Sequence, residues 1–364
     1  MLKSFYKAED SAQKGVAQAW QNGDWQPELV DEALDAATRY TTLESISLAL
    51  KVHHATVGFA TGVPEVFNEL LTTLPAKATW SKVALRLCGA YLQSQELSLA
   101  HQQVQQNLPG ACSVRCMHRL IRFPNVLDFL HEHYPEKLWG PARKQADLAR
   151  QLNCRVESFD VHSLGNSFDN RADDQSDLRV AVVGNGTSLL DAPSGQLIDD
   201  HDIVIRFNQP VLKEKYQAFT GSKTDALVIS PTLAKDLPVS GVDQVVISGI
   251  NIFSGESGYW QHVSRATAQT KIAVFDQSCW YSLVSELRAP PSSGLLTLAS
   301  LARKQCVDVS SFGFTKAQAT HSEGAGDGGT AYAFGANGSH YGDRKIASAR
   351  HNWQREAELV SQLT

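Results

Sequence analysis

The pattern of hydrophobic positions changes near the middle of the chain. Up to about residue 165, apolar residues recur at helical spacing, as in Val66-Phe67 followed by Leu70-Leu71, and turns rich in Gly and Pro separate the segments. From residue 179 onward, short runs of β-branched residues alternate with helix-like segments. This alternation predicts a mostly parallel sheet with helices on both faces, preceded by an all-α domain.

The same pattern predicts the domain boundaries. We expect a helical domain over residues 1–165, a linker over residues 166–178 and an α/β domain over residues 179–364. The linker is polar and almost free of apolar side chains, which is typical of a connecting segment. In the α/β domain the apolar runs 226–230, 245–248, 272–275 and 307–314 are expected to be strands, and residues 295–305 a helix.

The stretch 180–208 has the pattern of strand, glycine turn, short helix and strand that opens a doubly wound nucleotide-binding domain. Its first strand breaks at a Gly-Asn-Gly turn, and its second strand, 203–207, ends at Asn208. Ligands of such sheets bind outside the carboxyl ends of the strands. Asn185, Gly186 and Asn208 are therefore candidate ligand-binding residues.

Two common nucleotide motifs do not fit this part of the chain. The dinucleotide fingerprint Gly-x-Gly-x-x-Gly has Leu189 in place of its third glycine. Only the last part of a P-loop motif is present, in the segment 221–224, and the residue before the lysine is not a glycine. An NADP-binding oxidoreductase, with Arg206 near a 2'-phosphate, nevertheless stays open as an alternative. The chain contains no Gly-x-Ser-x-Gly elbow, which argues against a serine hydrolase.

Composition limits the function classes. Apolar residues make up 43% and charged residues 20% of the chain, as in ordinary globular proteins. A formal net charge of -5 argues against a nucleic-acid partner. No apolar run approaches the roughly 20 residues of a membrane span, and the first residues lack the apolar core of a secretory signal. With six sparse, irregularly spaced cysteines, we expect a soluble, cytoplasmic protein of a reducing compartment.

Metal-binding patterns are weak. The Asp-x-Asp pair of residues 200–202 precedes a predicted strand, whereas the metal-binding pair of many glycosyltransferases follows one. Cys112 and Cys116, with His118, have no second ligand pair downstream. We therefore expect no metal and no cofactor.

Two later segments suggest binding or closure. Residues 290–294, Pro-Pro-Ser-Ser-Gly, predict a tight turn into a helix, whose hydroxyls and first N–H groups either cap the helix or meet an anion. Residues 322–339 are rich in glycine and form either a surface loop or a lid over the site.

Four segments, in this order, resemble the sialylmotifs of the eukaryotic-type sialyltransferases, glycosyltransferase family 29. The large motif corresponds to the Val-Val-Gly-Asn turn, Gly195, Ile198-Asp199, His201-Asp202, Arg206-Phe207-Asn208 and Gly221-Ser222-Lys223-Thr224. The small motif corresponds to the segment from Pro290 through Cys306 to Gly313-Phe314, the third to His340-Tyr341, and the last to His351-x4-Glu356.

The chain departs from the family at several positions. Val180 stands where the family has the first cysteine of a disulfide, so Cys306 has no partner for that bridge. Gly342 replaces an aromatic residue of the third motif, and Ser293 replaces the threonine of the small motif. Golgi members of the family begin with a membrane anchor, and we expect none here.

The resemblance implies a Rossmann-like glycosyltransferase fold, a GT-A-like variant, and transfer of a sugar acid from a CMP-activated donor with inversion and without a metal. It implies His351 as the general base and His340 as the contact to the departing phosphate. The residues that it implies for donor binding are Asn185, Gly186, Asn208, Ser292, Ser293, Gly294, Gly313 and Phe314. The spacing i, i+5 favours a structural role for Glu356 over a contact with His351.

Donor and acceptor stay partly open. Sialic acid is the first expectation for the donor sugar and Kdo the second, and the acceptor is expected to be a glycan or glycolipid hydroxyl. The helical domain could pack on the α/β domain, recognise the acceptor, or bind a protein or a membrane surface peripherally. A catalytically inactive glycan- or nucleotide-binding module is a further alternative, against which the retention of His340 and His351 argues.

Overall fold

The protein is described from a computed structural model. The structure describes residues 14–16, 28–56, 62–72, 82–107, 124–164, 177–210, 212–229, 241–248, 263, 267–268, 270–314 and 351–363. Most of the predicted linker, the glycine-rich segment 322–339 and His340 lie outside these ranges. Among the described residues, no helix is long and apolar enough to cross a bilayer.

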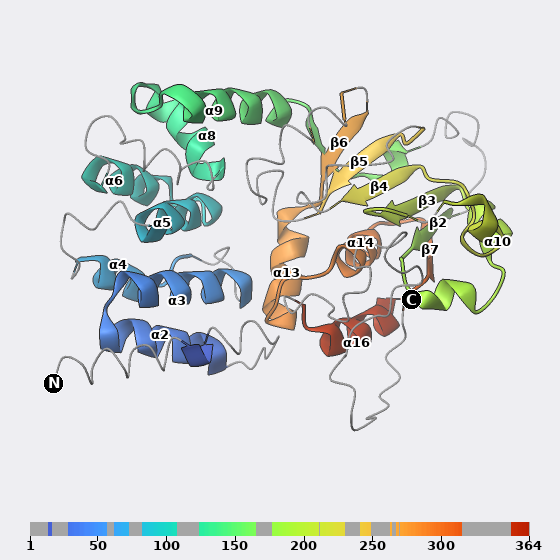
Figure 1. Ribbon diagram of the computed structural model, residues 1–364, viewed down its shortest axis with the longest axis horizontal. Coiled ribbons are helices and arrows are strands. Elements are labelled where there is room, and N and C mark those ends of the chain that lie inside the picture. Colours follow the sequence, from blue (N-terminus) through green and yellow to red (C-terminus); the bar gives the residue numbers. More distant parts are fainter. Residues whose placement is uncertain are drawn as a thin grey trace. The chain divides into compact units, whose positions relative to one another are not determined.

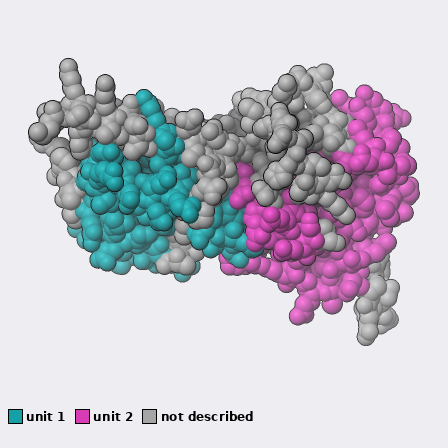
Figure 2. Space-filling view, turned by 90° about the horizontal axis from the view of Figure 1, so that it is seen from below, with its two compact units in different colours: residues 1–151, 281–290 teal, residues 152–280, 291–364 magenta. Residues whose placement is uncertain are grey.

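The chain divides into two compact units. The first comprises Met1–Gln151 and Tyr281–Pro290, and the second comprises Leu152–Trp280 and Pro291–Thr364 (Figure 2). This division differs from the expected boundary at residue 165, because residues 156–158 form an edge strand of the sheet in the second unit. That strand has only one partly buried residue and two exposed ones, so no apolar run marks it in the sequence.

The first unit is helical, as the periodicity predicts. Its helices are α2 (Glu28–Tyr40), α3 (Leu43–Thr56), α4 (Glu65–Thr72), α5 (Lys82–Gln93), α6 (Leu97–Asn107), α8 (Pro124–His133) and α9 (Gly140–Asn153) (Figure 1). A 3-10 turn, η2 (Pro135–Lys137), connects α8 and α9, and the last two residues of α9 belong to the second unit. In α2 the buried residues Leu29, Ala33, Ala36 and Ala37 lie on one face. This face packs on α3, and α5 packs on both α3 and α6.

The second unit contains a parallel sheet of seven strands. These are β1 (Val156–Ser158), β2 (Leu178–Val183), β3 (Ile203–Phe207), β4 (Ala226–Ile229), β5 (Gln244–Ile247), β6 (Lys271–Val274) and β7 (Val307–Phe312). Their order is β1-β6-β5-β4-β3-β2-β7, and every neighbouring pair is parallel. The chain therefore runs outward from β2 to β6 and then returns to the other side of β2.

Both faces of this sheet are covered. Successive side chains of a strand point to opposite faces, yet every residue of β3, β4 and β5 is buried. On one face Leu189 and Ile198 pack against Ala181, Val183 and Val204. Helix α14 (Ser293–Leu301) packs on β2 and β7. The predicted doubly wound α/β architecture is therefore confirmed.

The remaining elements of the described residues are short connections and two longer helices, α13 and α16. They are η3 (Val161–Ser163), η5 (Thr187–Leu190), α10 (Gly195–Asp199), η6 (Glu214–Tyr216), α11 (Gln217–Thr220), α13 (Gln277–Leu287) and α16 (Trp353–Leu363). Helix α16 lies beside α14 (Figure 1). The chain changes direction between β2 and β7, and ligands of open α/β sheets bind at the carboxyl ends of the strands at such a point.

Candidate functional site

The turn after β2 and the turn after β7 are in direct contact. The N–H of Gly184 donates to the carbonyl of Phe312 at 2.7 Å, and the N–H of Gly186 donates to the carbonyl of Gly313 at 3.1 Å. A Cβ added at Gly184 would lie 2.8 Å from the Gly313 oxygen, and one at Gly186 would overlap that oxygen. The two glycines are therefore required because two backbones meet here.

The two predicted asparagines lie at the ends of neighbouring strands. The side-chain amide of Asn185, after β2, donates to the carbonyl of Phe207 at 3.1 Å. Asn208 follows Phe207 directly, and its N–H donates to Val228 at 2.8 Å. Asn208 has a left-handed backbone, with φ of 53°, which asparagine tolerates better than most residues. The structure thus brings both side chains to one edge of the sheet.

The start of α14 approaches the same edge. Ser292 caps the helix, with its Oγ accepting the N–H of Leu295 at 3.2 Å, and Ser293 Oγ donates to Ser248 Oγ, after β5, at 2.8 Å. A Cβ at Gly294 would lie 2.6 Å from the ring of Phe314, so the ring rests against the first turn of α14. The same ring makes an edge contact with Phe207, with centroids 6.2 Å apart.

A carboxyl group connects this helix start to the end of the chain. Glu356 Oε1 accepts the N–H of Ser292 at 2.8 Å and lies 3.6 Å from Nδ1 of His351. Burial raises the pKa of Glu356 to about 7, and the hydrogen bonds from Ser292 oppose that shift. Only 4% of Glu356 is exposed, so this carboxyl and the His351 imidazole form a pair shielded from solvent on the carboxyl side.

The expectation that Glu356 does not contact His351 was wrong. The spacing argument assumed that both residues belong to one helix. Helix α16 instead begins at Trp353, and Asn352 accepts the N–H groups of Arg355 and Glu356 at its start. His351 precedes that cap, so its ring can turn back toward Glu356 in a way that helical geometry would forbid.

The described site residues are linked by contacts into one cluster. Contacts of the backbone or side chain connect Asn185, Gly186, Asn208, Gly313, Phe314, Gly294, Ser292, Glu356 and His351, and Ser293 extends the cluster to Ser248. His340 lies outside the described residues. Within the described ranges, no group of three or more His, Cys, Asp or Glu side chains is arranged to hold a metal.

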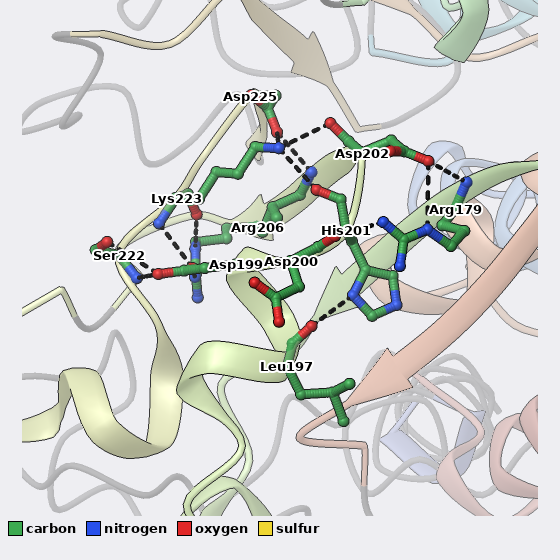
Figure 3. A network of polar contacts seen from close by, with 11 residues as sticks. Arg179, Leu197, Asp199, Asp200, His201, Asp202, Arg206, Ser222, Lys223 and Asp225 are labelled. Atoms are coloured by element: carbon green, nitrogen blue, oxygen red, sulfur yellow. Dashed lines mark hydrogen bonds and ion pairs between the residues drawn. The ribbon is translucent and has the colours of Figure 1, made fainter.

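A second part of the large motif forms a polar network that holds loops in place (Figure 3). Arg206 is 1% exposed and donates to the carbonyls of Lys223 and Thr220, each at 2.7 Å. The Asp199 carboxylate lies 3.9 Å from Arg206 and accepts the N–H groups of Ser222 and Lys223. A Cβ at Gly221 would overlap that carboxylate, so the glycine is required by the same contact.

This network bears on three interpretations of the sequence: an Arg206 that binds NADP, a P-loop at residues 221–224 and a metal-binding Asp-x-Asp pair at residues 200–202. Arg206 is buried with its donors on backbone carbonyls, so it cannot serve a 2'-phosphate as the oxidoreductase alternative requires. Lys223 Nζ donates to the carbonyls of His201 and Asp202 and pairs with Asp225 at 3.6 Å, a structural role unlike that of a P-loop lysine. The Asp202 carboxylate accepts the N–H of Arg179 at 3.0 Å and thus anchors the start of β2.

Two serines of the site were missed in the sequence. Ser248 follows β5, so the rule that strand ends carry ligand contacts would have found it. Ser188 lies in η5, and its Oγ would be 3.6 Å from a Cβ at Gly186. This Oγ is buried and has no hydrogen-bond partner among the residues that the structure describes. No sequence signal distinguishes it, because its position depends on how the turn folds.

Comparison with known proteins gives one family. The model of "Glycosyltransferase family 29 (sialyltransferase)" matches residues 131–247. That region includes strands β1 to β5, and it contains Asn185, Gly186 and Asn208. The starts of α14 and α16, with Ser292 and His351, lie outside the matched residues.

Curated relatives match over a short stretch. Alpha-2,8-sialyltransferase 8E of Homo sapiens is 40% identical over 55 residues, which is 15% of this chain and 15% of that protein. Alpha-N-acetylneuraminide alpha-2,8-sialyltransferase of Xenopus laevis is 38% identical over 55 residues, again 15% of each. Sialyltransferase-like protein 1 of Arabidopsis thaliana is 37% identical over 59 residues, 16% of this chain and 12% of that protein. The match thus spans only about a seventh of the length of the first relatives.

Solved structures are also similar to the chain. A mammalian sialyltransferase in complex with Gal-beta-1-3GalNAc-ortho-nitrophenol aligns with 18% identity, covering 70% of this chain and 84% of that chain, with a TM-score of 0.40. A second structure of a mammalian sialyltransferase aligns with 18% identity and a TM-score of 0.37, covering 70% and 83%.

Proposed function

We propose that this chain is a member of glycosyltransferase family 29 (sialyltransferase) and that it transfers a sugar acid from a CMP-activated donor to a hydroxyl of a glycan or glycolipid. The observation that carries this proposal is the single cluster at the strand ends. It unites the donor-binding residues implied by the motifs with a histidine suited to deprotonate an acceptor.

The cluster has the chemistry for a nucleotide phosphate. The first turn of α14 presents backbone N–H groups and the Ser292 and Ser293 hydroxyls, and a helix start favours an anion. Asn185 and Asn208 add amide groups that can pair with the polar edge of a base or with a ribose. Such donors would hold CMP without a bound metal, which is the mechanism we propose.

The base in this proposal is His351. Its side chain keeps 19% of its surface exposed, so it is sheltered without being closed off from an acceptor. The unperturbed pKa of histidine, about 6.5, suits proton removal near neutral pH. As the acceptor oxygen attacks the anomeric carbon, His351 takes its proton and CMP leaves from the opposite side, which inverts the centre. His340 would contact the departing phosphate.

For the donor sugar we infer sialic acid. The curated relatives are named as sialyltransferases, and the matched stretch contains the turn after β2. CMP-Kdo is the alternative sugar-acid donor, and the test below includes it. For the helical unit, a peripheral membrane or protein partner remains a prediction.

A cytoplasmic, reducing location is part of the proposal. Cys306 is free and exposed, and Val180 occupies the position of its family partner. Strands β2 and β7 pair along their length, and the N–H of Leu178 donates to the Cys306 carbonyl at 2.9 Å. These contacts support a pairing of β2 with β7 that needs no disulfide between positions 180 and 306.

The proposal is tested by titrating the purified protein with CMP in the presence of EDTA, with CTP, UDP and NADP as controls. We expect selective CMP binding, followed by transfer from CMP-sialic acid in a screen that also contains CMP-Kdo. Binding of NADP in place of CMP, or of no nucleotide, would contradict the proposal. Transfer from CMP-Kdo alone would correct the donor sugar and retain the reaction class.

A further inference from the structure

One buried carboxyl oxygen contacts both halves of the proposed reaction centre. Glu356 Oε1 accepts the N–H of Ser292, at the donor-binding start of α14, at 2.8 Å. The same oxygen lies 3.6 Å from Nδ1 of His351. The two partners are 64 and 5 residues away along the chain, so their convergence on one atom is a product of the fold.

We propose that Glu356 is a positioning residue: it holds the His351 ring through Nδ1 and ties that ring to the donor-binding turn at Ser292. This inference rests on the proposed function, in which His351 is the base. It assigns to Glu356 a role in the reaction that neither the family motif nor the helical spacing identified.

The geometry determines which nitrogen of His351 acts. A neutral imidazole donates through one ring nitrogen and accepts through the other. A carboxylate facing Nδ1 favours the tautomer with its proton on Nδ1, which makes Nε2 the nitrogen that takes the acceptor proton. The distance of 3.6 Å is longer than a hydrogen bond. Contacts of this kind are often long before substrates bind and shorten in the reacting complex.

Proton and electron movements balance in this arrangement. The acceptor O–H bond breaks, its proton moves to Nε2 of His351, and the oxygen forms the new bond to the anomeric carbon. The bond from that carbon to the CMP phosphate breaks, and its electron pair leaves with CMP. His351 becomes an imidazolium, whose positive charge is then next to the Glu356 carboxylate. Release of that proton to solvent restores the base.

The burial of Glu356 strengthens the interactions of its charge. The carboxyl is almost fully buried, where a charge interacts more strongly than at the surface. Its pKa is raised by burial and lowered by the Ser292 hydrogen bonds. Among the described residues, the titratable side chain within ion-pair distance of Glu356 is His351, and the start of α14, which packs on α16, contributes the Ser292 N–H.

A purely structural role for Glu356 makes a different prediction. If the carboxyl only ties α16 to α14, an uncharged side chain of the same shape and acceptor ability would do equally well. Glu356→Gln supplies that side chain, because its amide oxygen can still accept from Ser292 and from His351 Nδ1–H. The substitution therefore removes the charge and keeps an acceptor for the Ser292 N–H.

The experiment compares Glu356→Gln with wild type and with Glu358→Gln. Glu358 is an exposed carboxylate on the same helix, paired with Arg355 at 2.6 Å, which makes it a matched control. For Glu356→Gln we expect CMP affinity within about twofold of wild type and kcat lower by about tenfold. We also expect the wild-type pH–rate profile to rise through about pH 7, where the Glu356 carboxyl ionises, and Glu356→Gln to lose this dependence and keep only that of the base. Glu358→Gln should match wild type.

The outcomes separate this inference from the proposed function. If Glu356→Gln has the kcat and the pH profile of wild type while His351→Ala is inactive, the inference is wrong and the base assignment stands. If His351→Ala turns over normally, or CMP does not bind, the proposed function itself fails.

A second measurement needs no variant at position 356. In the wild-type protein with CMP bound, nitrogen-resolved NMR of labelled histidine reports the tautomer of His351, assigned by comparison with His351→Ala. We expect the proton on Nδ1. A neutral ring with its proton on Nε2 would overturn the inference even if Glu356→Gln failed to fold.

Discussion

At the scale of single residues, the candidate site depends on side chains whose surroundings are set by the fold. In the proposed function His351 acts as a base because its ring is sheltered and faces the Glu356 carboxyl, a contact that helical spacing does not predict. The same holds for the Ser188 hydroxyl, which is polar, buried and without a partner next to the turn after β2. Buried polar atoms without partners are uncommon, so each one calls for a physical explanation.

The first residue-level prediction concerns His351. We expect His351→Ala to lower kcat at least ~100-fold, because general-base assistance is lost, with only a modest change in CMP affinity. Steady-state kinetics and CMP titration measure the two effects separately. His162→Ala, an exposed histidine of η3, is the control and should leave both unchanged. Near-normal turnover would remove His351 from the base role.

The second residue-level prediction concerns Ser188. Its hydroxyl makes no protein hydrogen bond among the described residues, so Ser188→Ala should leave the melting temperature within about 1 °C of wild type. If the hydroxyl instead bonds the donor, CMP affinity should fall about three- to tenfold, the worth of one hydrogen bond. Calorimetric titration with CMP measures this affinity in wild type and in Ser188→Ala. Unchanged affinity would mean that the hydroxyl does not bond the nucleotide.

At the scale of elements, two backbone turns and one helix start make the site. The turns after β2 and β7 touch because glycines occupy the contact, and Gly313 has a left-handed φ of 71° that glycine adopts at no cost. Helix α14 is nine residues long and largely buried, so its first turn is held rigidly against Phe314, Ser248 and Glu356. Rigid elements of this kind are suited to preorganised binding.

Gly186→Ala tests that contact. The added Cβ would overlap the Gly313 carbonyl, so we expect the free energy of unfolding to fall by about 1–3 kcal/mol and CMP binding to be lost. Chemical denaturation and CMP titration are the measurements. Gly15→Ala is the matched control, since nothing lies within 4 Å of its added Cβ and it lies in a helix. Retention of wild-type stability and binding in Gly186→Ala would show that the two turns separate easily.

At the scale of the whole molecule, the buried carboxyl links stability to pH. The folded-state pKa of Glu356 is raised to about 7, above its usual value near 4.5, so the folded state binds this proton more tightly than the unfolded chain does. The resulting stabilisation is fully present below about pH 4.5 and is lost as the pH rises through about 7.

Replacing Glu356 by Gln should therefore remove this pH dependence. We expect the melting temperature of Glu356→Gln, relative to wild type, to rise by at least ~2 °C between pH 5 and pH 8, because only the wild type must bury a charge at the higher pH. Thermal unfolding at several pH values measures the difference, with Glu358→Gln as the control. A constant difference across this range would show that Glu356 titrates as an ordinary carboxyl.

The sequence already contained the parts of the molecule that depend on local order. The β-branched runs, the Gly-Asn-Gly turn and the Ser-capped helix start are each specified by a few neighbouring residues, and β2, β3, β4, β5 and α14 formed where these patterns predicted them. The order of motifs along the chain likewise indicated a resemblance to glycosyltransferase family 29, whose model matches residues 131–247.

Only the tertiary structure decided which distant segments meet. Residues 156–158 carry no strand pattern, and they join the sheet because β6, more than a hundred residues later, offers an edge. The Glu356 contacts with Ser292 and His351 arise because α16 packs on α14 and because a cap separates His351 from the helix. Hydrogen bonds and steric limits within a few residues are determined by the local sequence. The pairing of strands and the burial of side chains depend instead on the fold of the whole chain.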